Sequence, residues 1–347
     1  MRYMKLFGYF YSILRNIYIM NNISMDLMEL KIDKVDRMLL FELDRDCRQS
    51  YRQLAKKAGV SKDVALYKAR RLEKEGIING YYALIDFSKL GYFLIRVYLR
   101  LQRMTVEGEE QLISDLVKNK STLQVYKADG PWDVAMGILV RSFDEFYAVW
   151  EQFELKHRKH ILERNIAVLF KYVHYYRNYL VEKQKRDHNP ISAGNSKSEE
   201  FDTKDRMLLR ALATDAKTPI VRIAKQLNLP ISTTIYKLKR LEKTGVILAY
   251  KAKIDFEKLG YEYYKVDIYL DDIAMRKAIQ SFVEVRPEIV YEDITIGGSD
   301  VEFDVEVKRY DDFYSLLKEL RTAFPGAIRN YTFYKAKKIY KYIYVPE

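Results

Sequence analysis

The segment YKARRLEKEGIINGYYALIDFSKLG, from Tyr67 to Gly91, occurs a second time as YKLKRLEKTGVILAYKAKIDFEKLG, from Tyr236 to Gly260. The similarity extends upstream without a gap, so that residues 33–91 align with residues 202–260. The spacing between the copies exceeds the roughly 20–50 residues of solenoid arrays, which indicates a duplication of one large unit. The fold and the function of that unit are therefore the questions that the sequence poses.

The composition limits the classes of partner and compartment. Lys and Arg total 60 against 48 Asp and Glu, a formal charge of +12, which favours an anionic partner: nucleic acid first, an anionic membrane surface second. Cys47 is the only cysteine, so the chain has no intrachain disulfide and no thiolate zinc cluster. This cysteine usage is typical of a cytoplasmic protein.

Each unit begins with three short helical patterns. In the first unit they cover residues 32–46, 51–59 and 61–76, with Ser50 and Ser61 as expected N-caps. In the second unit the corresponding starts are Asp202, Thr218 and Pro230. A short helix, a tight turn and a basic helix form the helix-turn-helix pattern.

The period of the apolar residues changes after the third helix. GIINGYYALIDFSKLG at 76–91 predicts either two short strands around Asn79-Gly80 or one bent strand, as in a wing. The following patterns predict the order β-α-β-β-α-β, which is ferredoxin-like. The fold class is therefore α+β, with two repeats of a winged helix-turn-helix domain followed by a ferredoxin-like domain.

These patterns divide the chain into six segments. We expect an N-terminal extension at 1–30, winged helix-turn-helix domains at 31–91 and 200–260, ferredoxin-like domains at 92–180 and 261–347, and a polar linker at 181–199. Arg15 interrupts the apolar part of the extension, which is shorter than the roughly 20 apolar residues of a spanning helix. We therefore predict no membrane anchor.

The motifs resemble those of the Lrp/AsnC family of transcription regulators. They are D-x-x-D-R-x-L-L at 33–40 and 202–209, R-L-E-K-x-G-x-I at 71–78 and 240–247, and the I-D-F-x-K-L-G that follows. The resemblance implies a sequence-specific, DNA-binding transcription regulator with a sensor domain that responds to a small effector such as an amino acid. It places effector binding near the G-x-x-D turns, at Gly130, Asp133, Gly297 and Asp300. Members usually carry one unit, so the tandem copy departs from the family's pattern.

Double-stranded DNA needs Lys and Arg on one surface and a helix that fits the major groove. The spacing of Ala65, Ala69 and Leu72, and of Ile235, Leu238 and Leu241, predicts the core faces of the two basic helices. We assign base reading to Lys62, Asp63, Leu66 and Tyr67, and to Ser232, Thr233 and Tyr236. Phosphate contacts are assigned to Arg52, Lys56, Arg222 and Lys225. The other residues expected on the DNA-facing surfaces are Lys68, Arg70, Arg71, Lys237, Lys239 and Arg240.

Ion pairs within the helical domains would reduce the number of residues that are available to contact DNA. Arg71 and Glu73, like Arg240 and Glu242, are candidates for ion pairs within the domain, which would remove both arginines from the DNA surface. The near-duplication also predicts that the two sensor domains pair within the chain, as two copies of a self-complementary interface would. Further assembly between chains stays open.

The sequence contains few patterns that are typical of catalytic or metal sites. His157 and His160 form an H-x-x-H pattern without an acidic or cysteine partner at ligand spacing, so we expect no metal site, no cofactor and no enzymatic activity. One alternative is a siroheme decarboxylase-like enzyme, because such enzymes resemble this family in layout and must bind an acidic tetrapyrrole. Another is a regulator that senses no ligand and acts through assembly alone.

Overall fold

The computed structural model describes residues 31–181 and 190–343, so the predictions for residues 1–30 lie outside the described residues. Each unit begins with three helices. They are α2 (Lys34–Arg45), α3 (Tyr51–Ala58) and α4 (Lys62–Lys74) in the first unit, and α7 (Thr203–Thr214), α8 (Ile220–Leu227) and α9 (Ile231–Lys243) in the second. Helices α4 and α9 are the two basic helices of the repeat, and we call them the recognition helices.

Local sequence signals explain where most of these helices begin and end. Ser50 forms a capping box with Gln53 at the start of α3, and Ser61 accepts a hydrogen bond from the Val64 amide at the start of α4. Gly59 ends α3 in the left-handed conformation (φ 69°) that glycine adopts without strain. Thr218 was the wrong cap for the second unit, because α8 begins after Pro219 and the Thr218 hydroxyl donates to Asp215 instead.

The recognition helices bury equivalent faces. Ala65, Ala69 and Leu72 are fully buried on α4, as predicted. The equivalent buried residues of α9 are Thr234, Leu238 and Leu241, so the assignment of Ile235 to the core was wrong. Ile235 is 36% exposed, whereas the Thr234 hydroxyl is satisfied by the Pro230 carbonyl one turn earlier. A buried hydroxyl with this partner carries no desolvation penalty for an unmade hydrogen bond.

The two units share a two-stranded antiparallel sheet, which we call the wing sheet. Strand β1 (Ile78–Ile85) of the first unit pairs with β7 (Ile247–Ile254) of the second. The expected local hairpin at Asn79-Gly80 was therefore wrong, whereas the alternative of a single strand is confirmed. Ala83 and Ile85 pack into the apolar core of the second unit's helices, so a strand of the first half completes the core of the second unit.

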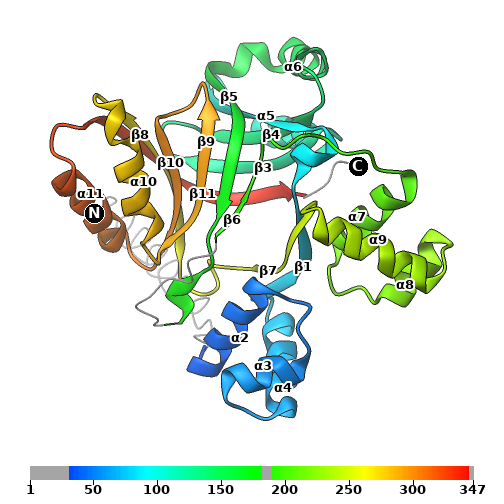
Figure 1. The fold of residues 1–347 in the computed structure, drawn as a ribbon. Helices are drawn as coiled ribbons and strands as arrows, with labels where there is room; N and C mark the ends of the chain where they lie inside the picture. The colour runs from blue at the N-terminus through cyan, green and yellow to red at the C-terminus, as the bar shows by residue number, and fades with distance from the viewer. Residues whose placement is uncertain (1–30, 182–189, 344–347) are drawn as a thin grey trace, which may run out of the picture. The chain divides into compact units, whose positions relative to one another are not determined.

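The remaining strands form one antiparallel sheet (Figure 1). In the first half, the strands of this sheet and the helices that connect them are β2 (Phe93–Leu101), α5 (Val106–Lys118), β3 (Thr122–Asp129), β4 (Val134–Val140), α6 (Phe143–His157) and β5 (Ile161–His174). In the second half they are β8 (Glu262–Leu270), α10 (Arg276–Glu284), β9 (Ile289–Ile296), β10 (Val301–Val307), α11 (Tyr310–Ala323) and β11 (Ile328–Tyr342). The α+β class is thus confirmed, and both halves have the order β-α-β-β-α-β.

The sheet closes on itself. Its strand order is β2-β4-β3-β11-β8-β10-β9-β5-β6, and β2 also pairs with β5, so every strand except β6 belongs to a closed ring. The halves meet at two equivalent seams, β3 with β11 and β5 with β9. The long strands β5 and β11 each pair with a strand of their own half and then with one of the other half. The β-α-β-β-α-β domains of the two halves therefore pair within the chain.

Period-two alternation gives the closed sheet two different faces. Val301, Phe303 and Val305 of β10 pack with helices α10 and α11, while Glu302, Asp304 and Glu306 point to the other face. On β8 and β2, Lys265 and Arg96 likewise point to the face opposite the apolar cores. The helix-covered face thus carries the apolar cores, and the inner face of the ring carries buried ionisable residues.

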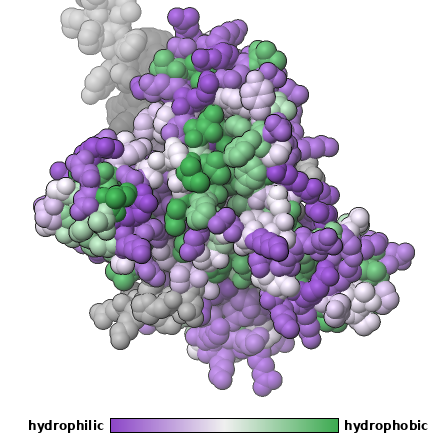
Figure 2. All heavy atoms as spheres, turned by 45° about the horizontal axis from the view of Figure 1, so that its top comes forward, coloured by the Kyte–Doolittle hydropathy of each residue, from purple (hydrophilic) through white to green (hydrophobic). Residues whose placement is uncertain are grey.

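Part of the predicted linker is ordered against the sheet. Residues Ile191–Ala193 form β6, which pairs with β5, and the Ser196 hydroxyl donates a hydrogen bond to Asp86 at 3.0 Å. Among the described residues, none of the helices is long and apolar enough to cross a membrane. Figure 2 shows a surface on which hydrophilic residues predominate, with apolar residues gathered in a patch near the middle of this face.

Candidate nucleic-acid interface

The N-terminal turns of the recognition helices present the side chains that could read bases. On α4, Lys62 and Asp63 are exposed, Leu66 is half-buried, and Tyr67 is 70% exposed. On α9, Ser232 is exposed, Thr233 is half-buried, and Tyr236 is 69% exposed. Tyr67 and Tyr236 occupy the same position of the repeat, and each projects an aromatic ring from the surface. The structure thus brings the seven predicted base readers to two equivalent surfaces.

The other cationic residues expected at the DNA-facing surfaces, including those assigned to phosphates, fall into two groups. The first group is exposed and carries its charge at the surface; it consists of Arg52, Lys56, Arg70, Arg222, Lys225 and Lys239. These residues flank the exposed recognition turns on α3, α4, α8 and α9. Exposed cations on a recognition helix and on the helix before it suit contact with a polyanionic duplex.

The second group forms ion pairs inside each helical unit. Lys68 and Arg71 bind the Asp36 carboxylate at 3.2 and 2.7 Å, and Asp36 has no exposed surface. In the second unit, Lys237 and Arg240 bind Asp205 at 3.1 and 2.5 Å. Losing a cation would leave a buried carboxylate undercompensated, which is costly. These four residues therefore hold the recognition helix on the first helix of its unit.

The partners of the arginines differ from the predicted ones. Glu73 accepts a hydrogen bond from the Tyr81 hydroxyl at 2.5 Å, and Glu242 accepts one from Tyr250 at 2.6 Å. Burial, together with the bond to Glu73, raises the pKa of Tyr81. Both tyrosines belong to the wing sheet, so the two glutamates join a recognition helix to the wing strand that follows it.

A pair of lysines that sequence reasoning missed links the two units. The Lys89 ammonium donates to the carbonyl of Thr244, the residue that ends α9. At the equivalent position, Lys258 donates to the carbonyl of Glu75, the residue that ends α4, at 3.0 Å. A cation at a helix C-terminus satisfies an unpaired carbonyl and opposes the helix dipole. The signal was present in the sequence, because both copies of the repeat keep the lysine of K-L-G.

The predicted effector turns lie at the seams. A Cβ at Gly130 would come within 2.8 Å of the Phe333 carbonyl oxygen, and one at Gly297 within 3.0 Å of the Ile166 carbonyl oxygen. Asp133 and Asp300 each accept a hydrogen bond from a backbone amide of the adjacent strand, at 2.6 and 2.8 Å. These contacts give both turns a structural role at the junction of the halves, and effector binding there stays a prediction.

Comparisons with known proteins agree with the helical architecture. The winged helix-turn-helix DNA-binding model matches residues 32–79 and 201–247. An uncharacterised HTH-type transcriptional regulator of Pyrococcus furiosus is 30% identical over 117 residues, 33% of this chain and 77% of its own length. The DNA-binding transcriptional activator DecR of Escherichia coli is 30% identical over 120 residues, 33% of this chain and 79% of its own length.

A solved structure extends the likeness to nearly the whole chain. The siroheme decarboxylase NirDL aligns with a TM-score of 0.61 over 90% of this chain and 94% of its own, at 12% identity. At that identity the likeness concerns the fold alone. The two regulators, by contrast, are 30% identical to this chain over more than three quarters of their own length. The chain therefore belongs to the Lrp/AsnC family of winged helix-turn-helix transcription regulators, with the family's unit present twice in one polypeptide.

Proposed function

We propose that this protein is a sequence-specific DNA-binding transcription regulator that engages two half-sites with one chain. The observation that carries the proposal is the pair of exposed recognition turns, each with a protruding tyrosine and flanking cations, joined through one wing sheet. In dimeric DNA-binding proteins, two such helices read two half-sites whose spacing mirrors the protein's symmetry. Here the duplication supplies both helices within a single chain, and we propose that the protein acts by binding and not by catalysis.

The two recognition surfaces differ in chemistry. Position for position, Lys62 and Asp63 of α4 correspond to Ile231 and Ser232 of α9, and Leu66 corresponds to Ile235. A charged pair and a neutral pair present different donors and acceptors to base edges in the major groove. The operator should therefore consist of two unlike half-sites, in contrast to the palindromes that symmetric homodimers read.

Regulation by a small effector is part of the proposal. The family resemblance supports an effector such as an amino acid near the Gly130–Asp133 and Gly297–Asp300 turns, and the seams give these turns contact with both halves. A ligand that altered a seam would act on both sensor domains at once. Further assembly between chains is compatible with this arrangement.

The second candidate function is a tetrapyrrole enzyme, because the fold is shared with NirDL over nearly the whole chain. The structure offers one argument against it. The buried cations Arg96, Arg177 and Lys265 are each paired with carboxylates of the chain. A tetrapyrrole with several carboxylates would have to displace these partners.

Titrations with DNA and with siroheme separate the two candidates. Fluorescence anisotropy with labelled DNA from upstream of the gene, at several salt concentrations, should show tight binding that weakens steeply as salt rises, because phosphate contacts release counterions. Scrambled DNA of the same length is the control. Equal, weak binding of both DNAs, together with a saturable optical titration by siroheme, would overturn the regulator assignment.

A further inference from the structure

A cavity of about 370 Å³ lies between the wing sheet and the inner face of the closed sheet. The wing sheet contributes Tyr82, Leu84, Ala252 and Lys253, and the closed sheet contributes residues from β2, β3, β5 and β8 to β11. Its volume falls within the range of about 300–1,000 Å³ that small-molecule sites occupy. Neither the effector turns nor the recognition helices line it, so it is separate from the sites described above.

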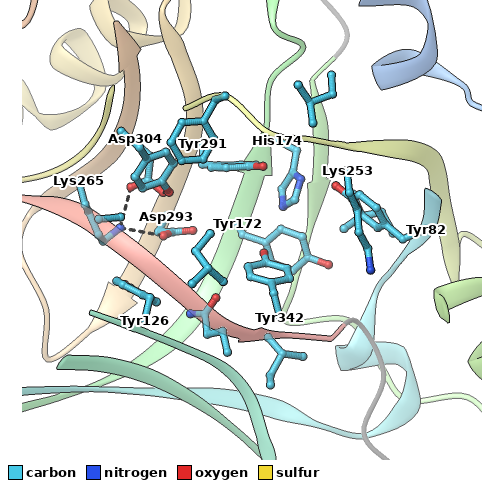
Figure 3. A pocket seen from close by; sticks show the side chains of 18 of the residues that line it. Tyr82, Tyr126, Tyr172, His174, Lys253, Lys265, Tyr291, Asp293, Asp304 and Tyr342 are labelled. Carbon is cyan, nitrogen blue, oxygen red and sulfur yellow. Dashed lines mark hydrogen bonds and ion pairs between the residues drawn. The ribbon is translucent and has the colours of Figure 1, made fainter. Parts of the chain in front are cut away.

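Aromatic rings dominate the middle of this cavity. Figure 3 shows Tyr172 and Tyr342 between the ionic group of Lys265, Asp293 and Asp304 on one side and Tyr82 and Lys253 on the other. The Tyr172 ring also stacks on Phe87 with centroids 5.4 Å apart. Such rings offer flat apolar faces to an aromatic ligand, which prefers offset-stacked or edge-to-face contacts.

Two of the buried cations in the cavity walls are paired with carboxylates of the chain. Lys265 binds Asp293 and Asp304 at 3.0 and 3.1 Å. On another wall, Arg177 binds Glu306 and Asp44, both at 2.9 Å. Because these buried cations have carboxylate partners, a ligand with a net charge would have to break a desolvated ion pair to gain one. The walls therefore favour a ligand without net charge.

The His174 side chain contributes a buried nitrogen to the walls that lacks a hydrogen-bond partner among the described residues. His174 is 7% exposed and lies between the rings of Tyr172 and Tyr291, at centroid distances of 5.3 and 4.5 Å. Its Nδ1 atom makes no hydrogen bond within the described part of the chain. Burial, reinforced by the nearby Lys251 ammonium, lowers the pKa of His174 to about 3, so the ring is neutral and offers Nδ1 as a single donor or acceptor.

We propose that this cavity binds a flat, uncharged aromatic molecule whose one polar group hydrogen-bonds to His174 Nδ1. The tyrosines and the apolar side chains of the walls would enclose its ring system. A buried nitrogen without a partner is costly, and a ligand that satisfies it recovers that cost. Because the walls come from both the wing sheet and the closed sheet, the bound molecule would contact both sheets and stabilise their packing.

The probe for the test is prodan, a neutral naphthalene fluorophore with one carbonyl acceptor. We expect saturable binding of one prodan per chain, with the blue-shifted emission of an apolar site and a higher melting temperature. Leu123→Trp, at a buried position that lines the cavity, and Ile339→Trp, at a lining position that is 52% exposed, should each weaken binding at least about tenfold by filling the space. Ile339→Trp keeps the test decisive if Leu123→Trp does not fold.

Two further variants refine the result. Leu155→Trp adds the same side chain at a position that is 83% exposed on α6, and it should leave prodan affinity unchanged. His174→Phe keeps a ring but removes the nitrogen, and it should weaken prodan about fivefold, the effect of one net hydrogen bond. No saturable binding, or equal affinity in the wild type and both cavity-filled variants, would overturn the proposal. Because the readout needs no DNA, it is independent of the regulator assignment.

Discussion

Arg96 connects the two halves of the chain at the centre of the closed sheet. Its guanidinium, on β2 of the first half, binds Asp293 at 2.5 Å and also Glu302, both on strands of the second half. Burial opposes the arginine's charge, but Glu302, followed by Tyr98 and Asp293, outweighs burial and holds the pKa of Arg96 above its ordinary value. We predict that Arg96→Met destabilises the folded chain strongly.

The expected magnitude follows from the groups that remain. After the substitution, Lys265 is the one cation within the described residues that still pairs with Asp293, Glu302 and Asp304, at 3.0, 3.4 and 3.1 Å. Removing one partner from a buried ionic group typically costs about 3–5 kcal/mol, because carboxylates are left buried without enough positive charge. Replacing Asp293 and Glu302 by Asn and Gln in the same variant should restore part of that stability.

Urea unfolding, monitored by circular dichroism, measures the effect. The matched control is Arg100→Met on the same strand, whose side chain is 52% exposed and pairs with Glu163 at 3.8 Å. This control should change the free energy of unfolding by less than about 1 kcal/mol, as exposed ion pairs do. If Arg96→Met costs no more than Arg100→Met, the two halves are not joined through this buried cluster.

Three further predictions concern the helical units and the cavity. Arg71→Ala should lower the free energy of unfolding by about 1–3 kcal/mol, because the buried Asp36 carboxylate loses the shorter of its two ion pairs. The salt dependence of DNA binding should stay the same. A weaker salt dependence at unchanged stability would instead show that Arg71 contacts DNA. Lys258→Met should weaken DNA binding, because the C-terminal end of α4 loses its contact with the Lys258 ammonium. The same change at Lys318, an exposed lysine of α11, should have no effect. Equal DNA affinities of the two variants would show that the contact to Glu75 does not position the helix. His174 has a pKa of about 3 in the folded chain and about 6.5 in the unfolded chain, so between these pH values only the unfolded chain binds the proton, and the free energy of unfolding should fall by up to about 1.4 kcal/mol for each unit that the pH falls. Urea unfolding of His174→Phe at several pH values should lack this component. A pH profile identical to that of the wild type would mean that His174 is not held neutral.

The elements could be predicted from the sequence because their signals are local. The alternation in VEFDVEV at residues 301–307 determines which face of β10 meets the helices, and the capping box at Ser50 determines where α3 begins. The core position of α9 was one residue off because Thr234 is polar by type, and only the carbonyl of Pro230 makes its burial acceptable. Thr218 failed as a cap because Pro219 takes the position before the helix.

Pairings between distant segments could not be predicted in the same way. The motif around Asn79-Gly80 is compatible with a local hairpin, and only the presence of β7 beside β1 shows that the strand pairs across the duplication. The recognition residues could be identified from the pattern, but the packing of the helices was needed to separate the exposed cations from those bound to Asp36 and Asp205. The cavity needed the closed ring, since its walls come from both halves of the chain.

The central claim is that one chain places both recognition helices on unlike half-sites, and footprinting tests it most directly. Hydroxyl-radical footprints of the wild type on DNA from upstream of the gene should show two protected segments. Because Tyr67 and Tyr236 protrude from different helices, Tyr67→Ala should weaken one segment and Tyr236→Ala the other. A single protected segment, or two segments that weaken equally with either variant, would contradict the claim.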